Sequence, residues 1–242
     1  MSNLNDYNRI SDRYQLTSQK PDKQFSSLPT VLGMAGDVSG KVVLDLGCGD
    51  GFFTNAIAKQ GAYKVFGVDN SEEQIKLAKK SQLKNTEYIL GDIFENELPN
   101  ADVVIAPYVL NYATSVDELT TLIRNIFNSL NIGGKLVAVV DLPEGRDLMR
   151  FGAIKSFKGD HNDGSEIMID LYNQNNHICT LSAHYYTPDT LERVLSEVGF
   201  SNTTWHLPSV SKEGIEKLGK EFWSGYLNSP ELGYLTTLKV SR

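Results

Sequence analysis

The sequence has few cysteines, no long apolar run and fewer basic than acidic side chains, and each shortage excludes a class of protein. Only Cys48 and Cys179 occur among 242 residues, which excludes a disulfide scaffold and favours a reducing compartment. No run of 18 apolar residues is present, so we expect no membrane span. The polar segment from Met1 to Arg13 lacks the apolar core of a secretory signal. These absences predict a cytoplasmic protein.

The charge balance is acidic, with 23 Lys and Arg side chains against 30 Asp and Glu, a formal net charge of −7. Such a chain offers no broad cationic surface to a phosphate backbone, so we expect no nucleic acid as its main partner. Hydrophobic residues make up 40% of the chain, which is enough for a sizeable core. Length and composition predict a single domain over residues 1–242. We expect either a monomer or a homodimer.

Short runs of apolar and β-branched residues alternate with helical patterns along most of the chain. The runs predict strands at residues 42–46, 65–69, 87–90, 101–106, 135–140, 201–207 and 234–240. The clearest helix starts after Ser115, because apolar residues recur at helical spacing from Leu119 to Leu130. Alternating strands and helices favour βαβ units, so we predict a doubly wound, Rossmann-like α/β fold. Its seven-stranded sheet is expected to be mostly parallel, with an antiparallel edge strand.

Two segments depart from this alternation. Residues 1–30 are polar and predict an irregular or partly helical arm. Within residues 141–186, alternating patterns at 166–172 and 177–186 predict an antiparallel hairpin inserted after the fifth strand. Nearer the C-terminus, a further helical stretch is predicted around residues 213–226.

A glycine-rich loop follows the first predicted strand, with the sequence Asp45-Leu46-Gly47-Cys48-Gly49-Asp50-Gly51. Glycines let such a turn tighten and let a ligand approach the backbone closely. The dinucleotide fingerprint G-x-G-x-x-G needs glycine where this chain has Phe52, and a P-loop needs a Gly-Lys-Ser/Thr triplet that is absent. The acid before the glycines would repel a pyrophosphate and attract an ammonium group.

Acidic residues also mark the ends of the next two predicted strands. Asp69 ends the second strand and Asp92 follows the third. At the carboxyl edge of a parallel sheet, Asp69 is placed to accept both hydroxyls of a ribose. Asp92 is placed to accept a hydrogen bond from the exocyclic amine of a base. Together with Asp45, these acids are expected to line one crevice.

These residues resemble the signature of class I S-adenosylmethionine-dependent methyltransferases, over roughly residues 41–140. The resemblance implies methyl transfer with S-adenosyl-L-methionine as cofactor and S-adenosyl-L-homocysteine as product. It further implies that Asp69 holds the ribose, that Asp92 holds the adenine, and that Asp45 acts through water or on the amino group. Two tyrosines of the arm would fold over the cofactor. The residues implied to bind it are Tyr7, Tyr14, Asp45, Gly47, Cys48, Gly49, Gly51, Asp69, Asn70, Asp92, Ile93, Pro107 and Tyr108.

The resemblance favours a small molecule as the methyl acceptor. Family members that methylate amino groups of nucleic-acid bases carry Asn/Asp-Pro-Pro-aromatic after the fourth strand, whereas this chain has Ala106-Pro107-Tyr108-Val109. The segment from Glu221-Phe222-Trp223 to Ser229-Pro230 resembles toxoflavin-pathway (azapteridine) N-methyltransferases. We therefore expect methylation of a nitrogen or oxygen of a metabolite or heteroaromatic compound.

Aromatic side chains are frequent in the inserted segment 141–186. They form either the hairpin's own small core or a lid that closes over the acceptor and excludes water. Methyl transfer from a sulfonium mainly needs alignment of the acceptor. A dedicated base is needed only if the acceptor must lose a proton before or during attack, and His184 and Tyr112 are the catalytic candidates. The four histidines are not spaced as metal ligands, and we expect no metal site. Candidate acceptor-binding residues are Tyr112, Phe151, Tyr172, Tyr185 and Trp223.

Three other functions remain open from the sequence. The same scaffold is used by NAD(P)-dependent oxidoreductases, although Phe52 and Asp45 argue against that cofactor. A non-catalytic protein that binds S-adenosylmethionine would carry the same loop and acids. An RNA methyltransferase is the third alternative, and the net charge of −7 argues against it.

Overall fold

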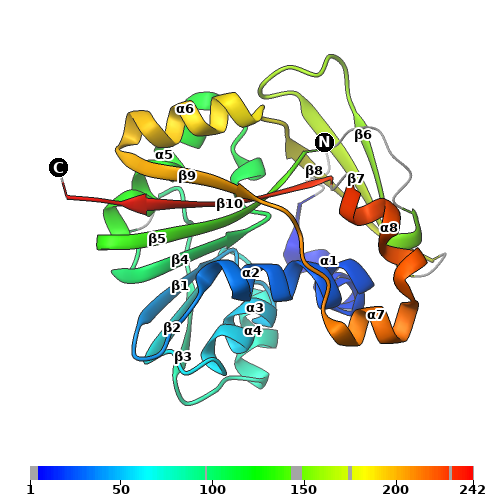
Figure 1. Ribbon diagram of the computed structural model, residues 1–242, viewed down its shortest axis with the longest axis horizontal. Helices are drawn as coiled ribbons and strands as arrows, with labels where there is room; N and C mark the ends of the chain where they lie inside the picture. Colours follow the sequence, from blue (N-terminus) through cyan, green and yellow to red (C-terminus); the bar gives the residue numbers. More distant parts are fainter. Residues whose placement is uncertain (1–4, 96, 143–148, 174–175, 229–230, 242) are drawn as a thin grey trace.

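A seven-stranded sheet forms the centre of the molecule, with helices on both faces and a second, three-stranded sheet beside it (Figure 1). The computed structural model describes residues 5–95, 97–142, 149–173, 176–228 and 231–241. The strands of the central sheet lie in the order β3-β2-β1-β4-β5-β10-β9. They are β1 (Val42–Leu46), β2 (Lys64–Asp69), β3 (Thr86–Leu90), β4 (Ala101–Pro107), β5 (Leu130–Asp141), β9 (Phe200–His206) and β10 (Leu232–Lys239).

The pairing of these strands confirms the predicted seven-stranded, mostly parallel sheet. Strands β1 to β5 pair in parallel, whereas β10 pairs antiparallel with both β5 and β9. The antiparallel strand lies one position in from the edge, because β9 pairs with its outer side. The carboxyl ends of five neighbouring parallel strands therefore meet along one edge of the sheet.

Helices cover both faces of the central sheet because successive side chains of a buried strand point to opposite sides. Helices α2 (Leu28–Ala35) and α3 (Phe52–Ala58) pack on the face that carries Val43 of β1. The neighbouring α4 (Glu72–Lys80) packs against β2 and β3. The opposite face carries α5 (Val116–Ser129) and α6 (Pro188–Val198) (Figure 1).

Hydroxyl side chains cap three of these helices. Ser71, Ser115 and Thr187 each accept a hydrogen bond from the backbone N–H three residues on, at 3.2 Å. Each bond satisfies one of the N–H groups that a first helical turn leaves without a partner. The starts of α4, α5 and α6 are thus determined by hydroxyl residues that directly precede each helix in the sequence.

The inserted segment is larger than the predicted hairpin. It forms a three-stranded antiparallel sheet of β6 (Ala153–Phe157), β7 (Glu166–Asn173) and β8 (Asn176–His184). Strands β7 and β8 are the predicted pair, and residues 174–175 between them lie outside the described residues. The sequence analysis missed β6, since its five residues are too short and mixed to show an alternating pattern.

The N-terminal arm packs along this second sheet. Its elements are α1 (Tyr7–Tyr14), a 3₁₀ turn at Gln15–Gln19 and a π-turn at Lys23–Ser27 that leads into α2. Tyr7 and Tyr14 of α1 pack on the apolar face of the second sheet. The predicted arm is therefore ordered and mostly helical over the residues described.

The helix predicted at 213–226 is two helices in the structure. They are α7 (Lys212–Leu218) and α8 (Lys220–Asn228), separated by Gly219 at a φ of 80°. A left-handed glycine ends the first helix because it cannot continue the right-handed turn. Short turns at Leu110–Tyr112 and Met149–Phe151 complete the described elements.

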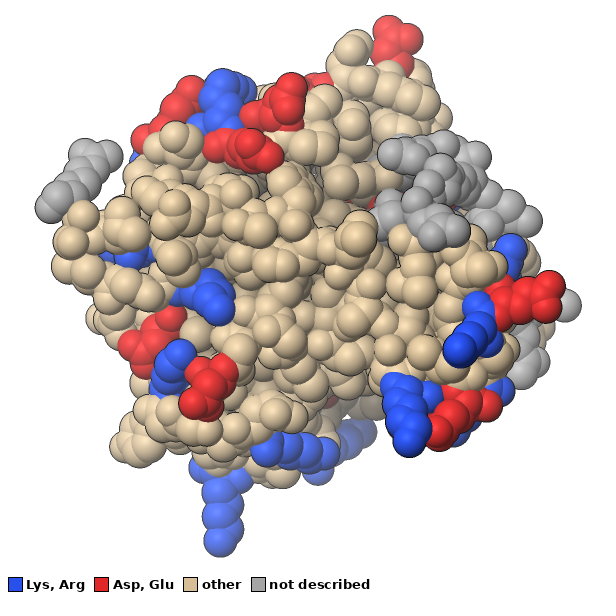
Figure 2. All heavy atoms as spheres, in the orientation of Figure 1, with Lys and Arg blue, Asp and Glu red and all other residues tan. Residues whose placement is uncertain are grey.

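The surface is uneven in charge. The face drawn in Figure 2 is mostly uncharged at its centre, and charged side chains of both signs lie around its rim. Within the described ranges, no helix is both long and apolar enough to cross a membrane.

Candidate functional site

The glycine-rich loop connects β1 to α3 at the carboxyl edge of the sheet. A Cβ atom added at Gly47 would lie 2.8 Å from Val109 Cγ2, and one at Gly51 would overlap the hydroxyl of Tyr88. Gly51 also has a φ of 85°, which L side chains rarely adopt. Close packing against β3 and against the segment that follows β4 thus requires glycine at both positions.

A cavity of about 360 Å³ opens beside this loop, and we call it the donor cavity. Its volume lies in the usual range for small-ligand sites. Its walls come from the arm, the glycine loop and the ends of β2, β3 and β4. The lining residues are Asn5, Tyr7, Tyr14, Lys23, Gly47, Cys48, Gly49, Asp50, Phe52, Phe53, Asp69, Asn70, Gln74, Gly91, Asp92, Ile93, Phe94, Pro107, Tyr108, Val109 and Tyr112.

The donor cavity brings together all the residues predicted to bind a cofactor except Asp45 and Gly51. Gly51 faces Tyr88 instead. Asp45 is buried in the core, where Oδ2 accepts a hydrogen bond of 2.6 Å from the Thr54 hydroxyl. Burial raises the pKa of the Asp45 carboxyl to about 7. The expectation that three acids line the crevice is therefore wrong for Asp45.

The other two predicted acids are held by backbone N–H groups. Asp69 Oδ2 accepts from the N–H of Gly49 at 2.9 Å, and Oδ1 accepts from that of Ser71 at 2.9 Å. Burial raises the pKa of Asp69, and these two N–H groups oppose the rise. Asp92 Oδ1 accepts from the N–H of Phe94 at 2.8 Å. Carboxylate oxygens have further lone pairs, so both acids can still accept from a ligand.

Lys23 of the arm also lines the donor cavity, and the sequence analysis missed it. It is the one basic side chain among the lining residues that the structure describes. Its Nζ lies 5.2 Å from the ring centroid of Phe52 and 5.8 Å from that of Tyr14. Burial lowers the pKa of Lys23, whereas the charge of Asp50 raises it. A lysine in a polar arm carries no sequence signal that would have marked it.

Gln74 is a second residue that the sequence analysis missed. Its Oε1 and Nε2 are buried and have no hydrogen-bond partner among the described residues. Gln74 lies three residues after the cap Ser71, the position at which the side chain of a capping box would bond to the Ser71 N–H. Instead the side chain lines the donor cavity, close to Gly49.

A second cavity of about 90 Å³ adjoins the first, and we call it the acceptor cavity. Tyr14, Lys23, Tyr108 and Tyr112 line both cavities and form the wall between them. The remaining lining residues come from the arm, the carboxyl end of β5, the inserted segment, α8 and the start of β10. They are Thr17, Lys20, Asp22, Asp141, Phe151, Ala153, Lys155, Ile169, Leu171, Leu181, Ala183, Tyr226, Glu231 and Leu232.

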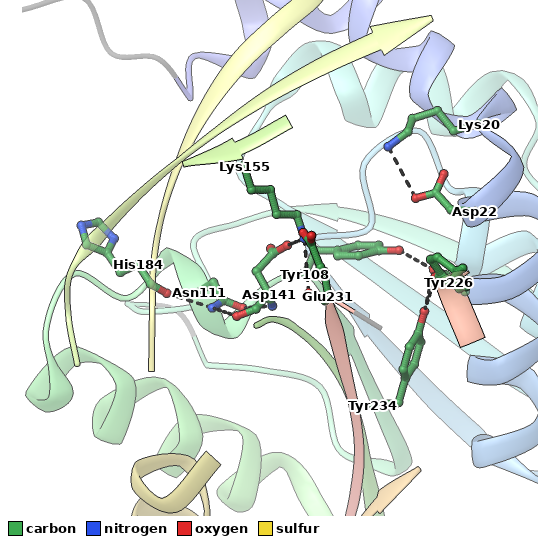
Figure 3. Close-up of polar contacts among 11 residues, drawn as sticks. Lys20, Asp22, Tyr108, Asn111, Asp141, Lys155, His184, Tyr226, Glu231 and Tyr234 are labelled. Carbon is green, nitrogen blue, oxygen red and sulfur yellow. Dashed lines mark hydrogen bonds and ion pairs between the residues drawn. The ribbon is translucent and has the colours of Figure 1, made fainter. Parts of the chain in front are cut away.

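Two ion pairs lie in the acceptor cavity (Figure 3). Lys155 Nζ lies 2.5 Å from Asp141 Oδ1, and their side chains are only 6% and 8% exposed. Lys155 belongs to β6 and Asp141 ends β5, so this pair ties the inserted sheet to the central sheet. Lys20 Nζ lies 3.5 Å from Asp22 Oδ2 within the arm.

Tyr108 has a constrained position between the cavities. Its φ of 64° is unusual for a residue other than glycine, and such strain is common at functional sites. Its hydroxyl donates to Ser27 Oγ at 2.7 Å. Ser27 Oγ is in turn bonded to the Tyr234 hydroxyl at 3.0 Å, which lies 3.2 Å from the Tyr226 hydroxyl (Figure 3). This chain of hydroxyls fixes the ring of Tyr108.

Of the residues predicted to bind the acceptor, the structure brings Tyr112 and Phe151 to the acceptor cavity. Trp223 lies behind the cavity wall, where its Nε1 donates to the Gly214 carbonyl at 3.0 Å. Tyr172 and Tyr185 pack on rings within the inserted segment instead. None of these three side chains lines the acceptor cavity.

The two catalytic candidates lie in different places. Tyr112 is in the wall between the cavities, and its hydroxyl is hydrogen-bonded to that of Tyr7. His184 lines neither cavity, and its ring points away from the ion pairs (Figure 3). Its backbone carbonyl accepts a hydrogen bond of 2.8 Å from Asn111 Nδ2, and this bond holds the end of β8 in place. Among the described residues, no group of three metal-ligating side chains is found.

The fold and the glycine loop agree with a comparison against protein families. Residues 37–156 match the family model described as a methyltransferase domain. These residues therefore form a methyltransferase domain. The match ends within β6, so the rest of the inserted sheet lies beyond it.

Curated proteins that are similar to this chain differ in the reactions that their names describe. A carboxy-S-adenosyl-L-methionine synthase of Idiomarina loihiensis is 38% identical over 103 residues, which cover 38% of this chain and 42% of that protein. A ubiquinone biosynthesis O-methyltransferase of Pseudomonas fluorescens is 34% identical over 106 residues, covering 41% and 44%. The chain thus matches less than half the length of these curated relatives.

A solved structure extends the likeness to almost the whole chain. The S-adenosylmethionine-dependent methyltransferase of Mesorhizobium loti superimposes with a TM-score of 0.63 at 18% identity. The match covers 92% of this chain and 99% of that one. At this identity the likeness establishes a shared methyltransferase fold.

Proposed function

We propose that this methyltransferase transfers the methyl group of S-adenosylmethionine, held in the donor cavity, to a small molecule in the acceptor cavity. One observation carries the proposal, namely that the cavities share a wall of four side chains. The donor cavity carries the glycine loop and two acids, whereas the acceptor cavity combines apolar walls with ion pairs. A donor and an acceptor bound in this way would meet at Tyr108.

The donor cavity offers a partner to each polar part of the cofactor. In this proposal Asp69 accepts hydrogen bonds from the ribose hydroxyls, and its two backbone N–H contacts hold the carboxylate in orientation. Asp92 accepts from the adenine amine, with Ile93 packed on the base. The backbone of Gly47 and Gly49 approaches the methionyl chain. Gln74 supplies both a donor and an acceptor of hydrogen bonds near the ribose.

Lys23 is the proposed partner of the cofactor's α-carboxylate. That carboxylate is the one anionic group of S-adenosylmethionine, and Lys23 is the one cation among the described residues of the donor cavity. Within the same described set, no carboxylate forms an ion pair with Lys23. A ligand carboxylate would therefore relieve the cost of burying this ammonium.

The wall between the cavities suits a sulfonium. Tyr14, Tyr108 and Tyr112 supply aromatic rings at the junction. Aromatic faces attract cations by up to about 2 kcal/mol where water is excluded. Tyr7 supports this wall through its hydroxyl contact to Tyr112. These rings would hold the donor methyl toward the acceptor.

The acceptor cavity favours a small molecule over a polymer. Its volume is about 90 Å³, and it lies between the arm and the inserted sheet, which we propose act as covers over the reactants. In the reaction, a lone pair of the acceptor attacks the methyl carbon as the carbon–sulfur bond breaks, which leaves a neutral thioether. An acceptor that begins as N–H or O–H then releases a proton. Alignment of this kind is worth about 7–11 kcal/mol in model reactions.

Two measurements test the proposed function. Thermal unfolding with S-adenosylhomocysteine and, separately, with NAD⁺ compares the two cofactors, and a ligand at 100 times its dissociation constant adds about 2.7 kcal/mol. We expect the melting temperature to rise with S-adenosylhomocysteine alone. Radiolabelled S-adenosylmethionine is then incubated with a panel of small heteroaromatic acceptors, and label should appear in an acceptor. A rise with NAD⁺ alone would favour an oxidoreductase, whereas cofactor binding without transfer would favour a non-catalytic binding protein.

A further inference from the structure

Two buried oxygen atoms at the acceptor cavity have no protein partner. Thr17 Oγ1 and Asp22 Oδ1 are both buried, and neither has a hydrogen bond among the residues that the structure describes. Thr17 is 4% exposed as a residue, and the Asp22 side chain is 13% exposed. Both residues line the acceptor cavity. Buried polar atoms nearly always have a partner, so these two point to a ligand.

We propose that Thr17 and Asp22 form the polar end of the acceptor cavity and bind a neutral N–H or O–H group of an aromatic acceptor. This inference rests on the proposed function, because it assigns the substrate class of the same site. An ionised carboxylate only accepts hydrogen bonds, so Asp22 requires a donor on the ligand. The Thr17 hydroxyl both donates and accepts, so it can bind the same group or a neighbouring oxygen or nitrogen.

The surrounding charges favour a neutral donor over an ammonium. Asp22 Oδ2 is already paired with Lys20, and Lys23 lines the same cavity. A cationic ligand at Asp22 would face the repulsion of both lysines, whereas a neutral N–H or O–H would not. Asp22 also lies near the phenols of Tyr108 and Tyr226. Burial and then the Asp22 charge raise the pKa of Tyr226 to about 12, so that phenol stays neutral.

The rest of the cavity favours an aromatic body for the ligand. The inserted sheet contributes the aliphatic side chains of Ile169, Leu171 and Leu181, and Phe151 and Tyr226 contribute rings. Apolar walls with few polar groups bind flat ring systems well, and the polar groups then fix their orientation. The ion pair of Lys155 and Asp141 lies elsewhere in the cavity (Figure 3). Thr17 and Asp22 would thus orient one edge of a planar ligand.

Matched fragment pairs test this inference on the full chain saturated with S-adenosylhomocysteine. The pairs are indole with 1-methylindole and 2-naphthol with 2-methoxynaphthalene, in which a methyl group replaces the hydrogen-bond donor. Dissociation constants are measured by ligand-observed NMR. We expect wild-type protein to bind each parent at least tenfold more tightly than its methylated partner. In Thr17→Val and in Asp22→Asn this preference should fall below about threefold, while Thr121→Val and Asp117→Asn on α5 retain it.

The outcomes separate this inference from the proposed function. The affinity for S-adenosylhomocysteine, measured on every variant, reports folding and donor binding. Equal binding of parent and methylated fragments, no fragment binding, or a preference that survives in both variants would overturn the inference alone. Failure of the wild-type protein to bind S-adenosylhomocysteine would overturn the proposed function, and this inference with it.

Discussion

Lys23→Met tests whether the arm recognises the carboxylate of the donor. Methionine keeps the length of the side chain, but it removes the ammonium, whose Nζ lies 5.2 Å from the ring centroid of Phe52. A charge-assisted contact at a half-buried site is worth about 2–3 kcal/mol, which corresponds to a loss of ~30- to 150-fold in affinity for S-adenosylhomocysteine. The expected loss is confined to ligands that carry the carboxylate.

Isothermal titration calorimetry with two ligands measures this effect directly. The wild-type protein and Lys23→Met are each titrated with S-adenosylhomocysteine and with its decarboxylated analogue. We expect wild-type protein to prefer the carboxylate form by the same ~30- to 150-fold, and the variant to bind both forms alike. Lys59→Met, at the exposed end of α3, is the control and should bind as wild type does. Equal losses for both ligands in Lys23→Met, or no loss, would refute the assignment.

The pH dependence of binding has a definite sign. Burial lowers the pKa of Lys23 in the free protein, and pairing with a carboxylate favours the protonated form. As pH rises past the lowered pKa, Lys23 must take up a proton on binding, so affinity for S-adenosylhomocysteine should fall. The fall should be absent from Lys23→Met. An identical pH profile of binding in the two proteins would contradict the pairing of Lys23 with the ligand carboxylate.

Three further predictions concern stability, each measured as the free energy of unfolding in denaturant. The pKa of Asp45 is about 7 in the folded protein and 3.8 when unfolded. The free energy of unfolding should therefore decline by up to about 4 kcal/mol as pH rises from ~4 to ~7. Asp45→Asn should abolish this decline. Gly51→Ala should cost about 2–4 kcal/mol because its Cβ would overlap Tyr88 at a positive φ, and adding Tyr88→Phe should recover part of that cost. Ser115→Ala should cost about 1 kcal/mol through loss of the α5 cap; equal stability would argue against the cap.

Much of the central sheet could be predicted because its signals are local. The strand that contains Val43 and the helix that starts after Ser115 each follow from a run of neighbouring residues. The donor cavity could be predicted in part for the same reason. Its glycine loop, Asp69 and Asp92 follow consecutive strands, and parallel strands bring their carboxyl ends to one edge.

The acceptor cavity could not be predicted because its walls come from distant parts of the chain. Lys155 meets Asp141 across two sheets, and the arm brings Lys23 and Asp22 to the same place. Contacts between such distant residues leave no periodic pattern in the sequence. Asp45 misled the sequence analysis because the side chain of a strand-end acid can face the core as readily as the cavity, and here Thr54 offers it a hydrogen bond.

Calorimetric titration of S-adenosylhomocysteine into wild-type protein and Asp69→Ala is the most direct test of the proposal that the donor cavity binds S-adenosylmethionine. Asp117→Ala on the exposed start of α5 serves as the matched control. Loss of charge-assisted bonds to the ribose hydroxyls, worth about 1.5–3 kcal/mol each, predicts at least a tenfold weaker affinity in Asp69→Ala. Saturable binding to the wild-type protein and the control, with this loss in Asp69→Ala, is the expected result. No binding to the wild-type protein, or equal binding to all three, would contradict the assignment of the donor cavity.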